Sequence, residues 1–337
     1  MSTSTEVVEL TPSERDKWNE LVRSSPQGTV FHRWEWLNAV SEARAAAIKI
    51  IGVYKGGVLI GGCAFAVVKM PFLKLAYSPA PNSLTYYGGL VLRESSTRHV
   101  RKVERLYKQV TNAVVDWFEA QGFNWVQLVN FPSLVDTRFF QWRGWRVGVR
   151  YTSFLEFRGQ EDFLNNIHDS ARRAIKSAIR HGVIVEERLS PSIIFELYRQ
   201  TRERRGLPYT SLRLFERLYE LFRRGLIEAH QFNAYNKQGE VLASTVFVSD
   251  KKRYYYWVSG TRKDVALHNA PSLILYHAVS VLNPSKPIDF IGANTPEIAK
   301  FKSGFNPKLT PFYVVEKPSS RYSLGKKVKS YIKALTR

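Results

Sequence analysis

The sequence is poor in cysteine, in long apolar runs and in acidic residues, and each shortage excludes a class of protein. Cys63 is the single cysteine among 337 residues, which excludes an intramolecular disulfide and a multi-cysteine zinc site. It lies in the apolar run Val58–Val68 and is interpreted as a buried structural thiol. The uncharged run Gly56–Val68 has 13 residues, whereas a membrane-spanning helix needs about 20. We therefore expect a soluble protein that is at most peripheral to a membrane.

Several signatures of targeting and catalysis are also missing. The first nine residues are polar, so no signal peptide is indicated and the predicted location is the cytoplasm, with the inner membrane face as an alternative. No Walker loop, no G-x-G-x-x-G and no G-x-S-x-G element is present. The seven histidines are scattered without metal-binding spacing. We therefore predict neither a metal site nor a serine-hydrolase nucleophile.

Basic residues dominate what is present. The chain has 50 Lys+Arg against 29 Asp+Glu, a formal net charge of +21. Residues 151–337 contribute +14 of this charge and residues 1–150 contribute +7. Such a balance predicts attraction to polyanions, which include RNA, phosphorylated substrates and anionic membranes, and it says nothing about fold.

The length and the order of the predicted elements indicate two domains. At roughly 100–200 residues per domain, two is the favoured count, and an aromatic content of 13% supplies material for two cores. Both halves show helices, then antiparallel strands, then alternating helices and strands. We predict an α/β protein with mixed sheets, divided into domains 1–150 and 151–316, with a basic amphipathic tail helix over 317–337.

The first candidate site is a cationic face on the predicted helix Ser170–His181. At 3.6 residues per turn, Arg172, Lys176 and Arg180 share one face and Arg173 lies beside them. Like charges so placed repel each other, so an opposing phosphate would stabilise them. The alternative is a solvated helix face without a ligand.

A second candidate is Arg204, at the end of the next predicted helix in Thr201-x-x-Arg204. An arginine there can bind a phosphate or carboxylate with two parallel hydrogen bonds. The alternative is that these basic residues simply complement the negative end of the helix dipole.

A third candidate is the segment Phe301–Phe305 before the last predicted strand. Phe301 and Lys302 combine an aromatic ring with a cation, which suits a nucleobase and an oxyanion. The alternative is two core phenylalanines with an exposed lysine. Asp289, at the end of the apolar strand Pro287–Phe290, is a candidate base, although a hydrogen-bonding role at the strand end is favoured.

The tail from Arg321 to Arg337 has an apolar stripe among lysines. This pattern is typical of a basic amphipathic helix. Packing of the stripe on the first domain is the favoured interpretation. Contact with an anionic membrane or with RNA is the alternative.

Taken together, six segments resemble the FemABX family of aminoacyltransferases within the GNAT superfamily. The most distinctive is Arg172–Val183, which is similar to the family's R-x-x-I-x-x-A-x-x-x-G-V segment. The family's long coiled-coil arm is not indicated here. The other five segments are Phe31–Leu37, Tyr86–Gly89, Thr201–Arg204, Ala270–Leu275 and Phe301–Phe305.

The resemblance implies two tandem GNAT-like domains and transfer of an aminoacyl group from aminoacyl-tRNA to an amine of a UDP- or lipid-linked peptidoglycan precursor. Lys302 would contact the acceptor end of the tRNA and the developing oxyanion, and Phe301 would shape that pocket. Arg204 and the cationic helix would hold phosphates. Since the ester is already activated, alignment and charge stabilisation suffice without a cofactor.

Two alternatives remain open from the sequence. One is an acyl-CoA-dependent N-acyltransferase in polysaccharide or lipid modification, although Ser259–His268 lacks the family's Q/R-x-x-G-x-G/A pyrophosphate loop. The other is a non-catalytic RNA- or membrane-binding protein on a transferase scaffold. The sequence leaves the transferred group, the acceptor and the oligomeric state open.

Overall fold

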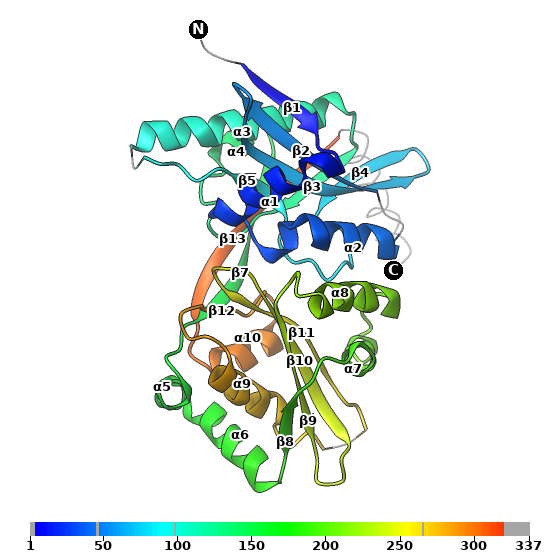
Figure 1. The fold of residues 1–337 in the computed structure, drawn as a ribbon, viewed down its shortest axis with the longest axis vertical. Helices are drawn as coiled ribbons and strands as arrows, with labels where there is room; N and C mark the ends of the chain where they lie inside the picture. Colours follow the sequence, from blue (N-terminus) through cyan, green and yellow to red (C-terminus); the bar gives the residue numbers. More distant parts are fainter. Residues whose placement is uncertain (1–3, 45–46, 98, 265, 320–337) are drawn as a thin grey trace, which may run out of the picture. The chain divides into compact units, whose positions relative to one another are not determined.

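The computed structural model describes residues 4–44, 47–97, 99–264 and 266–319, which form two compact units (Figure 1). Unit 1 comprises the residues up to Val149 and those from Phe312 on, and unit 2 comprises Arg150–Pro311. Residues 312–316, predicted in the second domain, thus belong to unit 1, because Val314–Pro318 pair with the strand Trp125–Val129. The predicted tail helix lies outside the described residues from position 320.

Unit 1 is a mixed sheet in the order β1-β2-β3-β4-β6-β13, with β5 paired to β3. Its long strand β3 has adjacent glycines that face opposite sides. A Cβ at Gly61 would lie 2.7 Å from Val110 of α3, and one at Gly62 would lie 2.8 Å from Trp18 of α1, so helices pack closely on both faces. The strands are β1 Thr5–Glu9, β2 Ala47–Lys55, β3 Val58–Met70, β4 Leu73–Ser78, β5 Gly89–Leu92, β6 Trp125–Val129 and β13 Lys308–Pro318, and the helices are η1 Pro12–Glu14, α1 Arg15–Ser24, η2 Val30–His32, α2 Trp34–Arg44, α3 Val100–Ala120 and α4 Arg138–Trp142.

The predicted Tyr86–Gly89 element has a structural explanation in unit 1. The Ser78 hydroxyl donates to Ala64 O and accepts from Gly89 N, and the Asn130 side chain accepts from Leu90 N. Gly89 has φ 76°, and a Cβ there would lie 2.1 Å from Asn130 Oδ1. Glycine is therefore required both by its backbone conformation and by this close approach.

We expect Gly89→Ala to lower the free energy of unfolding by about 3 kcal/mol, because left-handed strain and a steric clash add together. Gly57 is the matched control, since it also has φ 76° but has open space around its Cβ position. Gly57→Ala should cost only about 1 kcal/mol. Urea denaturation of both variants checks this, and equal losses would show that the contact with Asn130 is unimportant.

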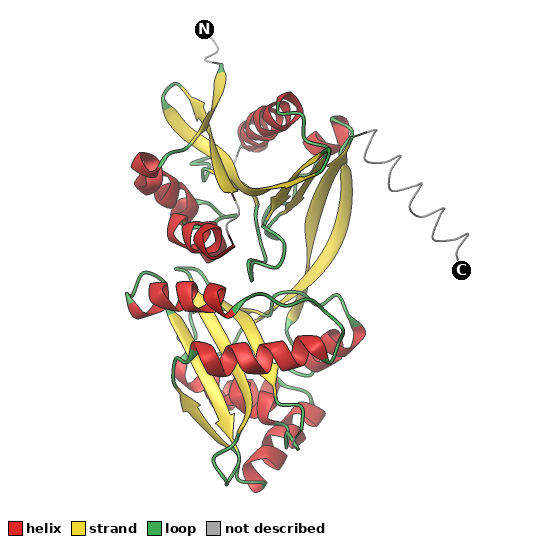
Figure 2. Cartoon of the chain, turned by 90° about the vertical axis from the view of Figure 1, so that its right-hand side faces the viewer, coloured by secondary structure: helices red, strands yellow, loops and turns green. Residues whose placement is uncertain are grey.

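In unit 2 the strands follow the order β7-β12-β11-β10-β9-β8, with parallel and antiparallel pairs, and helices cover both faces (Figures 1 and 2). The core against α5, α6 and α9 contains Phe247, Tyr256 and Phe290. On the opposite face, Trp257 packs against Phe215 and Phe222 of α8. The strands are β7 Arg146–Leu155, β8 Ile184–Glu187, β9 Ala229–Tyr235, β10 Val241–Ser249, β11 Tyr254–Thr261 and β12 Ile288–Asp289, and the helices are α5 Gln160–Asn166, α6 Asp169–Arg180, α7 Pro191–Glu203, α8 Leu212–Arg223, α9 Ala270–Val281 and α10 Pro296–Ser303.

The predicted α/β class with mixed sheets is confirmed. A capping box at Thr11 opens η1, with Glu14 accepting from Thr11 N. The strands β1 and β4 were not predicted. Within the described residues, we find no helix with the length and hydrophobicity needed to span a bilayer.

Candidate functional site

Two parallel strands separate at the centre of unit 2. Strand β12 pairs with β11 only at Tyr254 and Tyr255, while β11 continues to Thr261. Beyond Asp289 the chain follows β7 instead, since Phe290 N donates to Ser153 O (2.9 Å) and Ala293 N donates to Tyr151 O (2.8 Å). We name the two diverging segments, 256–261 and 290–292, the strand fork. The carboxyl ends of separating parallel strands are where open α/β sheets bind ligands.

A β-bulge places three hydroxyl groups together beside this fork. The register of β10 against β11 shifts between Val246 and Phe247, so Trp257 is an extra residue and Tyr256 and Ser259 lie on the same face. The Tyr256 hydroxyl lies 3.1 Å from Ser259 Oγ and 3.3 Å from Thr245 Oγ1. Thr245 Oγ1 is also 3.1 Å from Ser259 Oγ. We name these three residues the hydroxyl cluster.

Tyr256 links the hydroxyl cluster to the other arm of the fork. Its ring packs on that of Phe290, with centroids 5.7 Å apart at 67°. Burial raises the pKa of Tyr256, and the hydrogen bonds from Ser259 and Thr245 only partly oppose this. Tyr256 therefore stays protonated at neutral pH, so its hydroxyl is suited to donate a hydrogen bond or a proton. The aromatic run Tyr254–Trp257 is typical of a strand buried on both faces, so the sequence offered no signal for this position.

Lys302 holds the second arm of the fork. Its Nζ donates to the carbonyl oxygens of Phe290 (2.5 Å), Ile291 (3.1 Å) and Gly292 (2.6 Å). The side chain is buried, with 7% of the residue exposed, and burial lowers its pKa to about 8, with Asp289 opposing the shift. At neutral pH the ammonium group remains charged, and its three N–H donors match three carbonyl acceptors. The predicted oxyanion contact by Lys302 remains a prediction.

Asp289 acts on the same loop. Its Oδ1 accepts from Thr152 Oγ1 (2.5 Å) and from Ile291 N (2.8 Å), and Gly292 N donates to Thr152 Oγ1 (3.1 Å). Ile291 has φ 51°, a left-handed conformation that is unfavourable for a β-branched residue. Asp289 and Lys302 therefore fix a strained backbone at the end of β12. This is the hydrogen-bonding role that the sequence favoured for Asp289 over that of a base.

Phe301 packs into the core beside Lys302. It is half-buried and contacts Phe305 edge-on at a centroid distance of 5.1 Å. Phe305 in turn stacks on Phe163 of α5 at 6.0 Å. The structure thus brings Phe301, Lys302 and Asp289 together, with two phenylalanines in the core and the lysine buried rather than exposed.

Arg204 and Thr201 hold the end of β11. The Arg204 guanidinium donates to Thr261 O (3.0 Å), Thr261 Oγ1 (2.5 Å) and Arg262 O (3.1 Å). Thr261 N donates to Thr201 Oγ1 at 3.0 Å. The Thr201-x-x-Arg204 element therefore fixes the first arm of the fork, just as Lys302 fixes the second. Its predicted contact with acceptor phosphate remains a prediction.

The cationic face of α6 divides into two parts. Arg172 donates to the Leu164 and Ile167 carbonyls and pairs with Asp169 (3.1 Å), which anchors it to the preceding turn. The other three cations are exposed. With Ile179 they line a shallow hollow of about 550 Å³, and they are Arg173, Lys176 and Arg180.

The connection from β11 to α9 offers few backbone N–H donors to an anion. Ala270 N donates to Leu267 O (2.8 Å) and Ser272 N donates to Asn269 O (2.9 Å), and Pro271 has no N–H. Helix N-termini bind phosphates through free backbone N–H groups. Among the described residues that open α9, these donors are used internally or missing. Among the described residues, no group of three or more His, Cys, Asp or Glu side chains is arranged to hold a metal ion.

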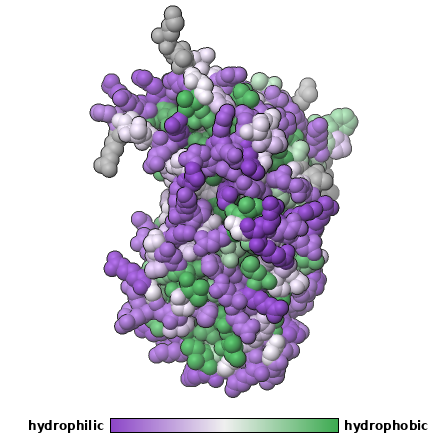
Figure 3. Space-filling model, in the orientation of Figure 1, coloured by the Kyte–Doolittle hydropathy of each residue, from purple (hydrophilic) through white to green (hydrophobic). Residues whose placement is uncertain are grey.

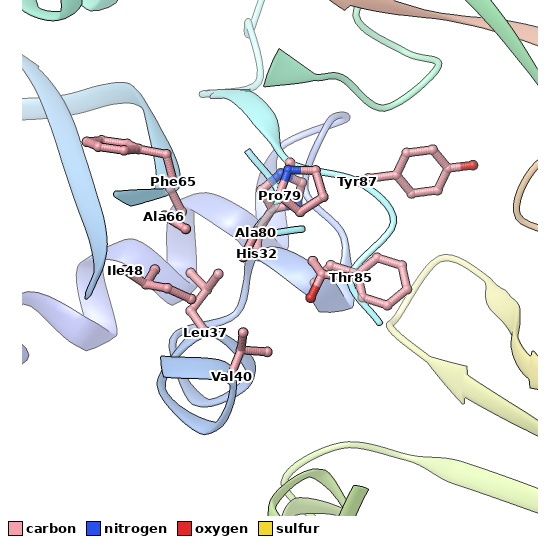
Figure 4. A pocket seen from close by; sticks show the side chains of 13 residues that line it. His32, Leu37, Val40, Ile48, Phe65, Ala66, Pro79, Ala80, Thr85 and Tyr87 are labelled. Atoms are coloured by element: carbon pink, nitrogen blue, oxygen red, sulfur yellow. The ribbon is translucent and has the colours of Figure 1, made fainter. Parts of the chain in front are cut away.

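Unit 1 has a separate apolar pocket (Figure 4). Its accessible volume is about 10 Å³, enough for about one water molecule. His32 lies in its wall, where its Nδ1 accepts from Thr29 N (3.2 Å) and lies 2.8 Å from Thr29 Oγ1. We assign this histidine to capping of η2, since the pocket is too small for a substrate.

Comparison with known proteins identifies similar folds. Residues 162–282 match the acetyltransferase (GNAT) domain family. FemX superposes with a TM-score of 0.66 at 14% identity, over 91% of this chain and 96% of that one. No curated protein matches. A tandem GNAT protein from the clavulanic acid biosynthesis pathway is also similar, with a TM-score of 0.55 and 13% identity over 94% of this chain and 100% of that one. L-PGS from Bacillus licheniformis has a TM-score of 0.53 and 10% identity over 91% of this chain and 92% of that one.

The predicted resemblance to the FemABX family is confirmed at the level of the fold, and the chain has the fold of a tandem GNAT protein. The strand fork and the bulge of β11 lie in unit 2, which contains the whole segment 162–282. The match of residues 162–282 to an acetyltransferase (GNAT) domain supports an acyltransferase. It leaves donor and acceptor to the chemistry of the site.

Proposed function

We propose that this protein is an N-acyltransferase that takes an aminoacyl group from aminoacyl-tRNA and transfers it to an amine of a UDP- or lipid-linked, peptidoglycan-type precursor. The strand fork of unit 2 is the reaction site. The observation that carries this proposal is the hydroxyl cluster beside a fork whose two arms are each fixed by a separate basic side chain, Arg204 and Lys302. The reaction is placed in the cytoplasm, where aminoacyl-tRNA is available.

The choice between aminoacyl-tRNA and acyl-CoA as the acyl donor rests on where the protein can bind the phosphates of each. A CoA pyrophosphate would need free N–H groups at the start of α9, and the described residues there use theirs internally. The phosphates of an RNA backbone need only exposed cations, and Arg173, Lys176 and Arg180 supply three around one hollow. These two observations favour aminoacyl-tRNA over acyl-CoA.

The chemistry requires alignment and one proton donor. The neutral acceptor amine attacks the ester carbonyl, and a C–N bond forms as the carbonyl oxygen becomes an oxyanion. The C–O bond to the ribose then breaks, and the leaving oxygen takes its proton from the Tyr256 hydroxyl. The oxyanion re-forms the carbonyl as this bond breaks, and the proton lost by the attacking nitrogen returns through Ser259 to Tyr256. Such proton donation contributes about 10²–10⁴-fold.

The donor assignment is tested by tRNA binding. Replacing Arg173, Lys176 and Arg180 together by Gln should weaken binding of aminoacyl-tRNA about tenfold near physiological salt and flatten its dependence on salt, because three phosphate contacts are lost. Filter binding over a salt series measures both. A matched triple replacement of the exposed residues Arg213, Arg223 and Arg224 by Gln removes the same charge from α8 and its end. Equal weakening by both triples, or displacement of tRNA by acetyl-CoA, would contradict the assignment.

A further inference from the structure

The hairpin between β3 and β4 exposes apolar side chains at its tip. Lys69 pairs with Lys74 and Met70 with Leu73, so Pro71 and Phe72 form a two-residue turn. Phe72 is completely exposed, at 101%, and Met70 is 53% exposed. The hairpin projects from unit 1 in Figure 1, and Figure 3 shows hydrophobic residues at that projecting edge. Large apolar side chains gathered at a projecting tip mark an interaction site.

The backbone conformation at the tip of the hairpin is also unfavourable for the residue that occupies it. Phe72 has φ 62°, a left-handed conformation that glycine adopts without cost and a bulky residue does not. The sequence thus places an aromatic ring where local conformation favours glycine and where the protein's own core gains nothing from it. Strain of this kind, held at an exposed turn, points to a contact outside the unit.

The surroundings of the hairpin are basic. Asn124 binds both backbone groups of Lys74, donating from N to Lys74 O and accepting at Oδ1 from Lys74 N, each at 2.8 Å. Ser319, the last described residue, donates its N–H to Asn124 O at 2.8 Å. The last described residue therefore lies beside Asn124, which binds the hairpin one residue pair below its tip. The 18 residues that follow contain no acidic residue and six cations, which are Arg321, Lys326, Lys327, Lys329, Lys333 and Arg337.

We propose that the Met70–Phe72 tip inserts into the interface of an anionic lipid membrane and that the basic segment 320–337 supplies the electrostatic attraction. Aromatic rings favour the membrane interface, and each cation near an anionic surface strengthens binding about fivefold. The charge pattern selects this partner. Lys69 and Lys74 would repel the basic segment if it covered the tip, whereas anionic lipid attracts both. Two exposed side chains are also far less than the roughly 800 Å² that each partner of a stable protein complex buries.

Vesicle co-sedimentation of the full chain tests the proposal. The wild-type chain should bind vesicles with about 30% phosphatidylglycerol and not pure phosphatidylcholine. Phe72→Ala should weaken this binding about tenfold, because the aromatic anchor is lost. Trp142→Ala is the matched control, since Trp142 is another exposed aromatic residue of unit 1 (64%), and it should bind like wild type. Replacing Lys326, Lys327 and Lys329 together by Gln should weaken binding about 100-fold.

Insertion itself is measured with a fluorophore at the tip. Cys63 is fully buried and burial raises its pKa to about 12, so a new cysteine can be labelled selectively. An environment-sensitive dye on Phe72→Cys should shift to the blue on anionic vesicles, while the same dye on Trp142→Cys should not. Absence of wild-type binding to anionic vesicles, equal shifts at both positions, or unchanged binding of Phe72→Ala would overturn the proposal. The last result, with vesicle binding intact, would assign the tip to a protein partner instead.

Discussion

The variant Tyr256→Phe is expected to lose about 10²–10⁴-fold in the rate of acyl transfer while it remains folded. The ring packs on Phe290, and phenylalanine keeps that packing. Only the hydroxyl is removed, and with it the proton that the leaving oxygen requires. Single-turnover transfer from aminoacyl-tRNA measures the loss. The affinity for tRNA should stay within about twofold, because Tyr256 is buried and carries no charge.

Tyr254→Phe is the matched control for this experiment. Tyr254 lies on the same face of β11 and its hydroxyl donates to Glu228 (3.2 Å), at the end of the strand where β12 is still paired. Its removal should change the rate less than about threefold. Equal losses in the two variants would show that tyrosine hydroxyls support the sheet in general. An unchanged rate in Tyr256→Phe would exclude the hydroxyl cluster from catalysis.

The variant Lys302→Met is expected to lower the free energy of unfolding of unit 2 by about 3 kcal/mol. Three buried carbonyl groups lose their donor, at about 1–3 kcal/mol each, while removal of a desolvated ammonium group offsets part of that loss. Methionine keeps the apolar stem in place. The unlocked loop should also reduce transfer, because the second arm of the strand fork loses its fixed geometry. Urea denaturation and the transfer rate are measured together.

Lys300→Met controls for the loss of charge, since Lys300 lies on the same helix and is exposed. It should change stability by less than about 0.5 kcal/mol. The two interpretations of Lys302 predict different pairs of results. A residue that positions the loop loses stability and rate together. A lysine that acts only on the oxyanion would lose rate at unchanged stability, and that result would contradict the structural assignment.

The sequence was sufficient for the class of fold, because periodicity and turn residues repeat in the same order in both halves. It also singled out Arg204, Asp289 and Lys302, each as a separate candidate. What it could not supply was their geometry. An exposed lysine was one of the two interpretations that the spacing allowed, whereas Lys302 is buried among three carbonyl groups that belong to a different segment of the chain. Contacts of this kind depend on tertiary packing.

Three features of the structure left no readable signal in the sequence. The bulge at Trp257 brings Tyr256 and Ser259 to one face, although their spacing in a regular strand would put them on opposite faces. Strand β4 was missed because Leu73–Ser78 lies between proline-containing segments and its partner β6 is far along the chain. The α6 face was predicted as four equivalent cations, but Arg172 is held by nearby carbonyl groups that periodicity does not reveal.

The most direct test of the account is a discharge experiment on the wild-type chain. Aminoacyl-tRNA with a labelled amino acid and labelled acetyl-CoA are each incubated with the protein and a panel of amine acceptors that includes UDP- and lipid-linked peptidoglycan-type precursors. Label should move from tRNA into an alkali-stable amide, acetyl-CoA should be left intact, and Tyr256→Phe should slow the transfer about 10²–10⁴-fold. Amide formation from acetyl-CoA, with tRNA discharged no faster than in buffer, would contradict it.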